Sequence, residues 1–245
     1  MKLAIFSDIH SNLEALEACH KRALQLGAEG FVCLGDVTGY GADPAATVDR
    51  LMSIDNLIAV RGNHEEALFA ELSEGVKESL KQTVEWTKNH LNDKQLRFLD
   101  SLPYLLEAHG VTFVHASANH PRHWVYMGQG DTVEHCMEAA RTNVTFIGHA
   151  HIPRVFYKTG SGDVCELKPR EEVLIPLMSN RHYVISIGSV GQPRDGDCAS
   201  CFVMYDDIKR EISFHRVVYN HVETARKILA ANLNSAFAER LSHAK

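Results

Sequence analysis

Residue types that bind metal ions follow five short apolar runs of the sequence. Within four positions of the end of each run comes an aspartate, an asparagine or a histidine. The seven side chains of this kind are Asp8, His10, Asp36, Asn63, His115, His149 and His151. Carboxylate and imidazole ligands without thiolate favour Mn, Fe, Zn or Ni over a soft Cu(I) site. The pattern therefore indicates metal-dependent chemistry.

The five apolar runs have the length of buried strands. They cover residues 3–6, 31–34, 57–60, 111–114 and 144–147. In open α/β sheets, ligands bind beyond the carboxyl ends of the strands. Five such ends in one sheet would bring their polar residues to one rim. A single histidine or aspartate in such a place is more often a core, capping or surface residue, but five strand ends with the same feature favour one shared site.

The number and charge of these side chains suit a pair of metal ions. Two ions with four protein ligands each, sharing Asp36, need the seven ligands that the sequence offers. Two divalent ions, the carboxylates of Asp8 and Asp36 and a bridging hydroxide leave about one positive charge on the centre. Such a centre attracts a phosphate anion. Asn63 fits this need as a neutral oxygen ligand, because a third carboxylate would cancel the attraction.

The motifs around these residues resemble the five conserved blocks of the calcineurin-like metallophosphoesterases. The blocks stand in the family's order between residues 8 and 151. They are Asp8-x-His10, Gly35-Asp36, Gly62-Asn63-His64-Glu65, His115 and Gly148-His149-x-His151. Any one block is common, but all five in order form a specific signal. Residues 7–12 and 39–44 are most similar to the small bacterial and archaeal branch of this family.

The resemblance implies a fold, a ligand set and a mechanism. The implied fold is an α/β, four-layer αββα sandwich of two mixed β-sheets flanked by helices. One metal ion is assigned to Asp8, His10, Asp36 and His151, and the other to Asp36, Asn63, His115 and His149. The implied reaction is in-line attack on phosphorus by the bridging water or hydroxide, between two ions about 3.5–4 Å apart. His64 is implied as the general acid that protonates the leaving oxygen.

The first 150 residues alternate short apolar runs with amphipathic stretches that predict helices. Ser11 and Glu14 have the spacing of a capping box at the start of the first helix. Pro44 suits the first turn of the second helix. Residues 64–101 predict helix with a break near Asn92. Two short runs on either side of His109-Gly110 predict a hairpin.

The second half of the chain is rich in strands. The strand-like segments are residues 154–157, 164–167, 183–187, 202–205 and 211–217. This change of pattern predicts two sheets packed in a single domain, residues 1–245. A long helix is expected over about residues 221–243, with Leu229, Leu233, Phe237 and Leu241 spaced four apart. We expect this face to pack on the body of the protein, and a homodimer contact is the alternative.

Composition limits the classes of partner. The chain has 245 residues, and its 25 Lys plus Arg against 31 Asp plus Glu give a net charge of −6 with all 15 histidines neutral. This balance argues against duplex nucleic acid, whose binding needs cations that displace counterions. No apolar run approaches a membrane span, and the first residues do not resemble a signal peptide. We therefore expect a cytoplasmic protein with reduced cysteines, and Cys198-x-x-Cys201 alone is a weak metal or redox signal.

Substrate contacts are less specific in the sequence. Asn12, Arg61 and Arg194 are candidates, and each is as well explained by a structural role. Arg194 lies in the glycine-rich stretch 188–196 and has the geometry to hold a phosphate through two hydrogen bonds. The stretch 119–124 carries a tryptophan and two histidines, which either stack on a nucleobase or cover the core. We favour the covering role.

The sequence thus predicts a hydrolase that acts on a small phosphate ester or nucleotide, with phosphodiester cleavage favoured. A phosphomonoesterase resembling the protein phosphatases and a dinucleoside polyphosphate hydrolase are the alternative enzymes. Protein phosphatases of this family carry G-D-x-x-D-R-G, whereas residues 35–41 here are G-D-V-T-G-Y-G, so the group that orients His64 is open. The alternative outside enzymes is a scaffold that keeps the fold and the metal ions. The presence of His64 favours the enzyme.

Overall fold

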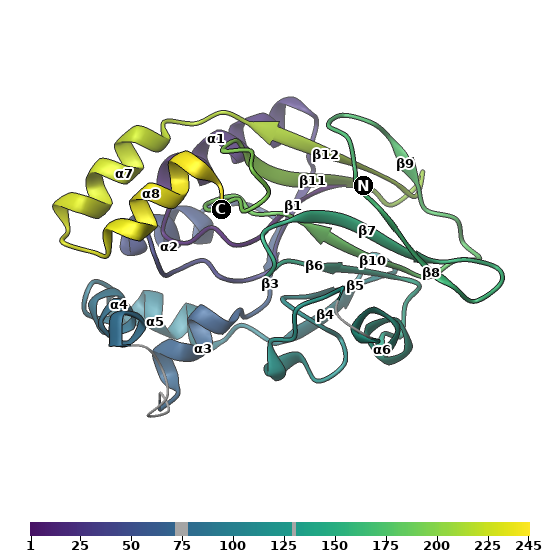
Figure 1. Ribbon diagram of the computed structural model, residues 1–245, viewed down its shortest axis with the longest axis horizontal. Coiled ribbons are helices and arrows are strands. Elements are labelled where there is room, and N and C mark those ends of the chain that lie inside the picture. The colour runs from purple at the N-terminus through teal and green to yellow at the C-terminus, as the bar shows by residue number, and fades with distance from the viewer. Residues whose placement is uncertain (72–77, 129–130) are drawn as a thin grey trace.

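The computed structural model describes residues 1–71, 78–128 and 131–245, and these form two mixed six-stranded β-sheets flanked by helices (Figure 1). The first sheet has the order β3 (Leu57–Ala59), β2 (Gly30–Cys33), β1 (Lys2–Phe6), β11 (Ser200–Asp206), β12 (Glu211–Val217) and β9 (Ile175–Pro176). The second has the order β4 (Leu105–Ala108), β5 (Val111–Val114), β6 (Val144–Ile147), β10 (Tyr183–Ile187), β7 (Pro153–Lys158) and β8 (Val164–Leu167). The predicted α/β sandwich of two mixed sheets is confirmed.

Each sheet contains three neighbouring parallel strands. In the first sheet β1, β2 and β3 run parallel, and in the second β5, β6 and β10 do. Parallel neighbours need a crossover connection, which is usually a helix. Here α1 (Leu13–Gln25) connects β1 to β2, and α2 (Pro44–Met52) connects β2 to β3. The carboxyl ends of these strands therefore lie together at one edge of each sheet.

Alternation along β1 explains why the sheets have two apolar faces. Leu3 and Ile5 belong to the core between the sheets, together with Phe113 and Phe146 of the second sheet. Ala4 and Phe6 point the other way, into a core shared with the helices. Successive side chains of a strand alternate between the two faces of the sheet. Where both faces are covered, the sequence of the strand is therefore a continuous apolar run.

Helices cover the outer faces of both sheets and complete the four layers. Helices α1, α2 and α5 (Asp93–Asp100) contribute Leu16, Leu51 and Leu99 to the core on the first sheet. Helix α6 (Thr132–Ala139) packs Val133 and Met137 on the second sheet. In the described part of the chain, no helix is long and apolar enough to span a membrane.

The region predicted as broken helix contains three helices, α3 (Asn63–Phe69), α4 (Glu78–Asn89) and α5. The break near Asn92 is confirmed, because the Asn92 side chain caps α5 by accepting hydrogen bonds from the backbone N–H groups of Lys94 and Gln95. Residues 72–77, which the same prediction covered, lie outside the described residues. The predicted hairpin is also confirmed, as β4 pairs antiparallel with β5.

Two local predictions are wrong. The first helix is capped by Asn12, whose Oδ1 accepts from the backbone N–H of Ala15, and not by Ser11. The long C-terminal helix is two helices, α7 (His221–Ala230) and α8 (Ser235–His243). Asn232 between them has a left-handed backbone, and the Asn234 side chain caps α8.

The break between α7 and α8 also changes which apolar residues are buried. Phe237 and Leu241 are buried against Ile228 and Tyr40, whereas Leu229 is 53% exposed. Apolar residues spaced four apart do not form one continuous face here, because α8 points in a different direction from α7 (Figure 1). Helix α7 contacts both α8 and α1.

Candidate metal centre

The predicted ligands come from strand ends in both sheets. Three ends belong to the first sheet and two to the second, and the strand ends of both sheets share one rim. The ligands are Asp8 and His10 after β1, Asp36 after β2, Asn63 after β3, His115 after β5, and His149 and His151 after β6. A hydrogen bond connects the strand ends of the two sheets, because the backbone N–H of His149 donates to Oδ2 of Asp8 over 3.0 Å.

The backbone at this rim is left-handed at five of the predicted ligands. The residues with φ between 51° and 64° are Asp8, His10, Asp36, His149 and His151. Non-glycine residues seldom adopt this conformation, and each costs of order 1–3 kcal/mol. The surrounding chain holds them in place, as where the N–H groups of Asp8 and His10 donate to the carbonyls of Gly35 and Asp36.

The ligand atoms form two groups on either side of Asp36. In the first, the Nε2 atom of His151 lies 3.2 Å from Oδ1 of Asp8 and 3.2 Å from Nε2 of His10. In the second, His115 Nε2 lies 3.3 Å from Oδ2 of Asp36. The triplets Asp8, His10, His151 and Asp36, His115, His149 each have one ligand atom per residue within 4.8 Å of the others.

Asp36 and Asn63 complete the arrangement. Oδ2 of Asp36 also lies 3.8 Å from Nε2 of His10, so this carboxylate faces both groups. The Oδ1 atom of Asn63 lies 3.1 Å from Nε2 of His115. The structure thus brings all seven predicted side chains to one place.

The histidine rings are fixed from behind by backbone carbonyls. Nδ1 of His10 lies 3.1 Å from the oxygen of Thr38, Nδ1 of His115 lies 2.7 Å from that of Leu34, and Nδ1 of His151 lies 2.6 Å from that of Gln192. A carbonyl only accepts, so each Nδ1 carries the proton. In the neutral ring Nε2 then has a free lone pair that faces the cluster, which is the arrangement of metal-binding histidines.

Two buried atoms of the cluster have no hydrogen-bond partner among the described residues. They are Oδ1 of Asp8 and Nε2 of His149. Buried polar atoms are nearly always hydrogen-bonded, since leaving one unpaired costs about 1–3 kcal/mol. A divalent cation is the partner that a carboxylate oxygen and an imidazole nitrogen share. The residues present therefore fit a metal site.

Protonation in the metal-free cluster reflects burial and mutual charge. Burial would raise the pKa of Asp8, but His151 and His115 together outweigh it and hold the pKa below its usual range. Burial likewise opposes a charge on His115, but Asp36 raises the pKa of this ring to about 9. Burial and His115 lower the pKa of His149 to about 4. At neutral pH Asp8 is thus ionised and His149 neutral, the states that bind metal ions.

His64 lies at the edge of this cluster, in the first turn of α3. Its backbone N–H donates to Oδ1 of Asp36 over 2.9 Å, and its Nε2 lies 4.0 Å from Oδ2 of the same residue. The imidazole ring packs against the rings of His10 at 4.7 Å and Tyr40 at 4.6 Å between centroids. Packing against these two rings orients His64, whereas the protein phosphatases use the second aspartate of their motif for this purpose.

Glu65 has a role that the sequence did not reveal. Its buried carboxylate accepts hydrogen bonds from the backbone N–H groups of Asp36 at 2.8 Å, Thr38 at 3.0 Å and Gly62 at 3.0 Å. It thereby ties the start of α3 to the loop after β2, which carries the central ligand. The available signal was the spacing, because a glutamate three residues after a helix cap commonly binds backbone N–H groups there.

The three candidate substrate contacts have different surroundings. Asn12 is buried, and its Nδ2 donates to the carbonyl of Gly191 and to the hydroxyl of Tyr219. Arg61 donates to Glu66 and to Asp100. Both side chains therefore have structural partners. Arg194 also has partners within the protein, since its Nη2 donates to Oε1 of Gln192 and its guanidinium lies over the ring of Tyr40 at 5.8 Å.

The loop after β5 covers the cluster from the second sheet. The ring of Tyr126 stacks on that of His149 at 4.3 Å, and that of Trp124 meets His115 edge-on at 5.8 Å. His120 and His123 stack on each other at 5.0 Å, and both are exposed. Tyr126 is 49% exposed, so this loop shields the ligand rings on one side and presents an aromatic surface on the other.

Comparison with known proteins agrees with this geometry. Residues 1–208 match the model of the calcineurin-like phosphoesterase superfamily domain. The chain belongs to this superfamily. Family membership makes it a metal-dependent phosphoesterase, and the His/Asp clusters able to hold metal ions agree with that assignment.

Relatives cover the chain to different extents. The uncharacterized protein MJ0912 of Methanocaldococcus jannaschii is 35% identical over 98% of this chain and 96% of its own length. A crystal structure of a metallophosphoesterase from Sphaerobacter thermophilus has a TM-score of 0.88 and 31% identity, covering 100% of this chain and 99% of that one. Phosphodiesterase YfcE of Escherichia coli is 40% identical over 72 residues, which are 26% of this chain and 39% of YfcE.

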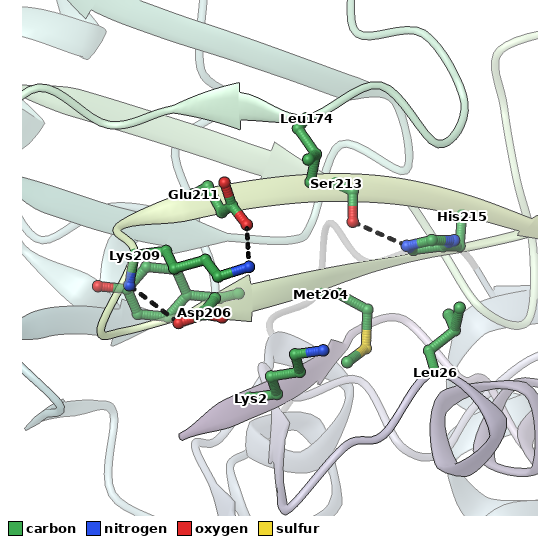
Figure 2. Close-up of a pocket in the computed structure, with 10 residues that line it drawn as sticks. Lys2, Leu26, Leu174, Met204, Asp206, Lys209, Glu211, Ser213 and His215 are labelled. Carbon is green, nitrogen blue, oxygen red and sulfur yellow. Dashed lines mark hydrogen bonds and ion pairs between the residues drawn. The ribbon is translucent and has the colours of Figure 1, made fainter.

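A separate cavity of about 170 Å³ lies on the first sheet, and none of the seven predicted ligands lines it. Figure 2 shows Lys2, Met204 and Leu26 along it, with Ser213 and His215 on β12. The Oγ atom of Ser213 lies 2.8 Å from Nε2 of His215, whose ring also stacks on Phe202. His215 is thus held within the packing of the first sheet.

Proposed function

We propose that this protein hydrolyses small phosphodiesters with two divalent metal ions. The ions are held by the two groups that share Asp36, with Asn63 as the neutral ligand. The observation that carries the proposal is that Asp8 Oδ1 and His149 Nε2, two buried atoms within a cluster of metal-ligand types, have no hydrogen-bond partner among the described residues. Bound divalent ions supply positive charge for a phosphate group and lower the pKa of a coordinated water.

The side chains of the protein divide the remaining tasks. Asp36 fixes the spacing between the two groups because its Oδ2 faces His10 and His115 at once. His64 lies beside the cluster, within reach of an oxygen that leaves phosphorus, and donates a proton to it. Glu65 holds the loop that carries Asp36 and the helix that carries His64 in one position. Tyr126 and Trp124 shield the second group of ligands from water.

The preference for a diester rests on sequence similarity to a phosphodiesterase and on a difference from the protein-phosphatase motif. The stretch similar to the YfcE phosphodiesterase amounts to 26% of the chain at 40% identity. The chain also lacks the second aspartate and the arginine of the protein-phosphatase motif in residues 35–41. These two features favour a diester over a phosphoprotein or another monoester.

Reconstitution with defined metals tests the proposal. Metal-stripped protein is loaded with Mn²⁺, Fe²⁺, Ni²⁺ or Zn²⁺ and assayed with bis-p-nitrophenyl phosphate and p-nitrophenyl phosphate. We expect hydrolysis with at least one metal, and a higher kcat/KM for the diester. Asp36→Asn should lose bound metal and activity together, whereas Asp55→Asn, the same change at an exposed site, should keep both.

Two outcomes contradict the proposal. Protein that contains metal, by elemental analysis, but hydrolyses neither ester with any ion would be a scaffold. A higher kcat/KM for the monoester would refute the diester preference and leave the metal centre standing.

A further inference from the structure

Two arginines that share one hydrogen-bond acceptor lie beside the metal-binding rim. Arg194 follows the turn after β10, and Arg240 belongs to α8. Nη2 of Arg194 donates to Oε1 of Gln192 at 3.0 Å, and Nη1 of Arg240 donates to the same oxygen at 3.1 Å. Among the residues that the structure describes, neither guanidinium pairs with an aspartate or glutamate side chain; Nε of Arg240 donates to the main-chain oxygen of Lys245.

This arginine pair, Arg194 and Arg240, is in contact with the candidate active site. Arg194 lies over the ring of Tyr40, and the same ring packs on His64 at 4.6 Å. The backbone N–H of Arg194 donates to the carbonyl of His151, and the carbonyl of Gln192 holds Nδ1 of that ring. The arginine pair is therefore one side chain away from the general acid and tied to one of the ligands.

Like charges at one oxygen atom repel each other, and among the described residues no aspartate or glutamate side chain pairs with either guanidinium at this oxygen. Nε of Arg194 is buried without a hydrogen-bond partner. Burial and the charge of Arg194 lower the pKa of Arg240. Folding nevertheless brings α8 to this place, where Phe237 packs on Tyr40 at 4.9 Å. An anion between the guanidinium groups would satisfy the unpaired donor and reverse the repulsion.

The position of the pair defines which part of a substrate it would meet. Tyr40 connects Arg194 to His64, the residue that protonates the leaving oxygen in the proposed function. A group bound by the arginines is thus on the leaving-group side. Guanidinium groups present parallel N–H donors that match the oxygens of a phosphate.

We propose that Arg194 and Arg240 bind a second phosphate group, carried by the leaving group of the substrate. The substrate class is then a phosphoric anhydride or ester with at least two phosphates, such as a dinucleoside polyphosphate, cleaved to release a phosphorylated product. This inference rests on the proposed function for the identity of the reacting site, and its test includes binding to metal-free protein.

Activity measurements compare substrates with one and with several phosphates. The metal-loaded protein is assayed with bis-p-nitrophenyl phosphate and with diadenosine triphosphate, and the ratio of the two kcat/KM values is compared between variants. Arg240→Gln and Arg194→Gln should each lower the ratio for the triphosphate by about tenfold or more, the value of a charge-assisted hydrogen bond. Arg240→Lys should recover part of the loss, and Arg226→Gln, an exposed change on α7, should not alter the ratio.

Binding measurements separate the inference from the proposed function. Calorimetry of metal-stripped protein with pyrophosphate should show binding that weakens about tenfold in both glutamine variants and not in Arg226→Gln. Thermal unfolding of each variant checks that it is folded. Pyrophosphate binding that is absent, or equal in all variants, together with an unchanged substrate ratio, overturns the inference even if bis-p-nitrophenyl phosphate is hydrolysed. Loss of binding in the variants supports it even if no ester is cleaved.

Discussion

At the scale of single residues, His64 is oriented by ring packing. The rings of His10 and Tyr40 confine the imidazole, and its backbone N–H is fixed by Asp36. Such an arrangement sets the position of Nε2 without adding a carboxylate to a site that must attract phosphate. The backbone of His64 is therefore tied directly to Asp36.

Replacing His64 by alanine should separate chemistry from metal binding. The ring supplies no atom that the seven ligands need, so His64→Ala should keep its metal content. We expect kcat to fall by about 10²–10⁴-fold, the usual contribution of a positioned acid. The loss should be larger for an alkyl ester than for a nitrophenyl ester, whose leaving group needs less protonation. Exposed His243→Ala is the matched control, and an unchanged kcat for the alkyl ester would contradict the role.

Glu65 should matter for stability and for metal binding together. In Glu65→Gln one oxygen becomes an NH₂ group that faces the backbone donors of Asp36 and Gly62 or of Thr38. We expect the free energy of unfolding to fall by about 2–4 kcal/mol, because a buried donor loses a charged acceptor. Urea denaturation and a metal titration measure the two effects. Glu85→Gln, on the exposed side of α4, should change neither; a stable variant with native metal affinity would argue against the role.

The types of the ligands were visible in the sequence, whereas their supporting partners were not. Asp8 and His115 stand within two positions of the end of an apolar run, so position along a strand was enough to find them. The carbonyls that hold the histidine rings belong to residues such as Thr38 and Gln192, far away in the chain. Nor did local spacing indicate that Arg194 and Arg240 donate to the same oxygen. Contacts of this kind depend on the whole fold.

At the scale of elements, the loop after β2 shapes the acid's position as much as α3 does. Gly39 has a φ of +91°, and a Cβ there would lie 2.1 Å from Nδ1 of His64. Such a contact is far inside van der Waals distance. Only glycine therefore fits at position 39, because the imidazole of His64 occupies the space that a Cβ atom would need.

Gly39→Ala should displace His64 and leave the ligands of the second sheet in place. We expect kcat to fall at least tenfold with little change in metal content, besides a loss of about 1 kcal/mol or more in stability from the backbone conformation. Gly162→Ala is the control for the backbone effect, since Gly162 has a φ of +98° and nothing within 4 Å of its Cβ position. Equal effects of the two substitutions on kcat would show that steric contact with His64 is not the cause.

Elements with strong local patterns were predictable, and their partners in the sheets were not. The runs that became β1, β5 and β10 are continuous and apolar, as buried strands are. Their division between two sheets follows from packing across the core, and the residues next to each strand in the sequence do not indicate to which sheet it belongs. Strand β9 is two residues long and exists through pairing with β12. The break before α8 depended on asparagines that tolerate a left-handed backbone and cap a helix.

At the scale of the whole molecule, net charge and local charge differ. The chain carries −6, yet the predicted ligands contain only two carboxylates among four imidazoles and one amide. In the metal-free protein the charge of Asp36 holds a proton on His115. Binding of a cation displaces that proton, because a ligand nitrogen must be free.

Metal binding should therefore release protons in a way that depends on pH. With a pKa of about 9, above the ordinary value for histidine, His115 is protonated at pH 7 and neutral at pH 10. We expect about one more proton to be released per protein at pH 7 than at pH 10, because His115 has lost its proton at pH 10 before the metal binds. Calorimetric titration with Zn²⁺ or Mn²⁺ in buffers of different ionisation enthalpy measures this number. The apparent affinity should rise between pH 7 and 9, and the same heat in every buffer at pH 7 would contradict the assignment.

The left-handed backbone of five predicted ligands also affects how a protein of this fold would lose its activity during evolution. Five of the predicted ligands hold a backbone that glycine adopts freely, so each carries an energetic cost that glycine would not have. In a lineage released from selection for catalysis, glycine at Asp8 or His151 would remove both the strain and a buried polar group. Inactive descendants should therefore be more stable than the enzyme, and their first substitutions should fall on the ligands themselves.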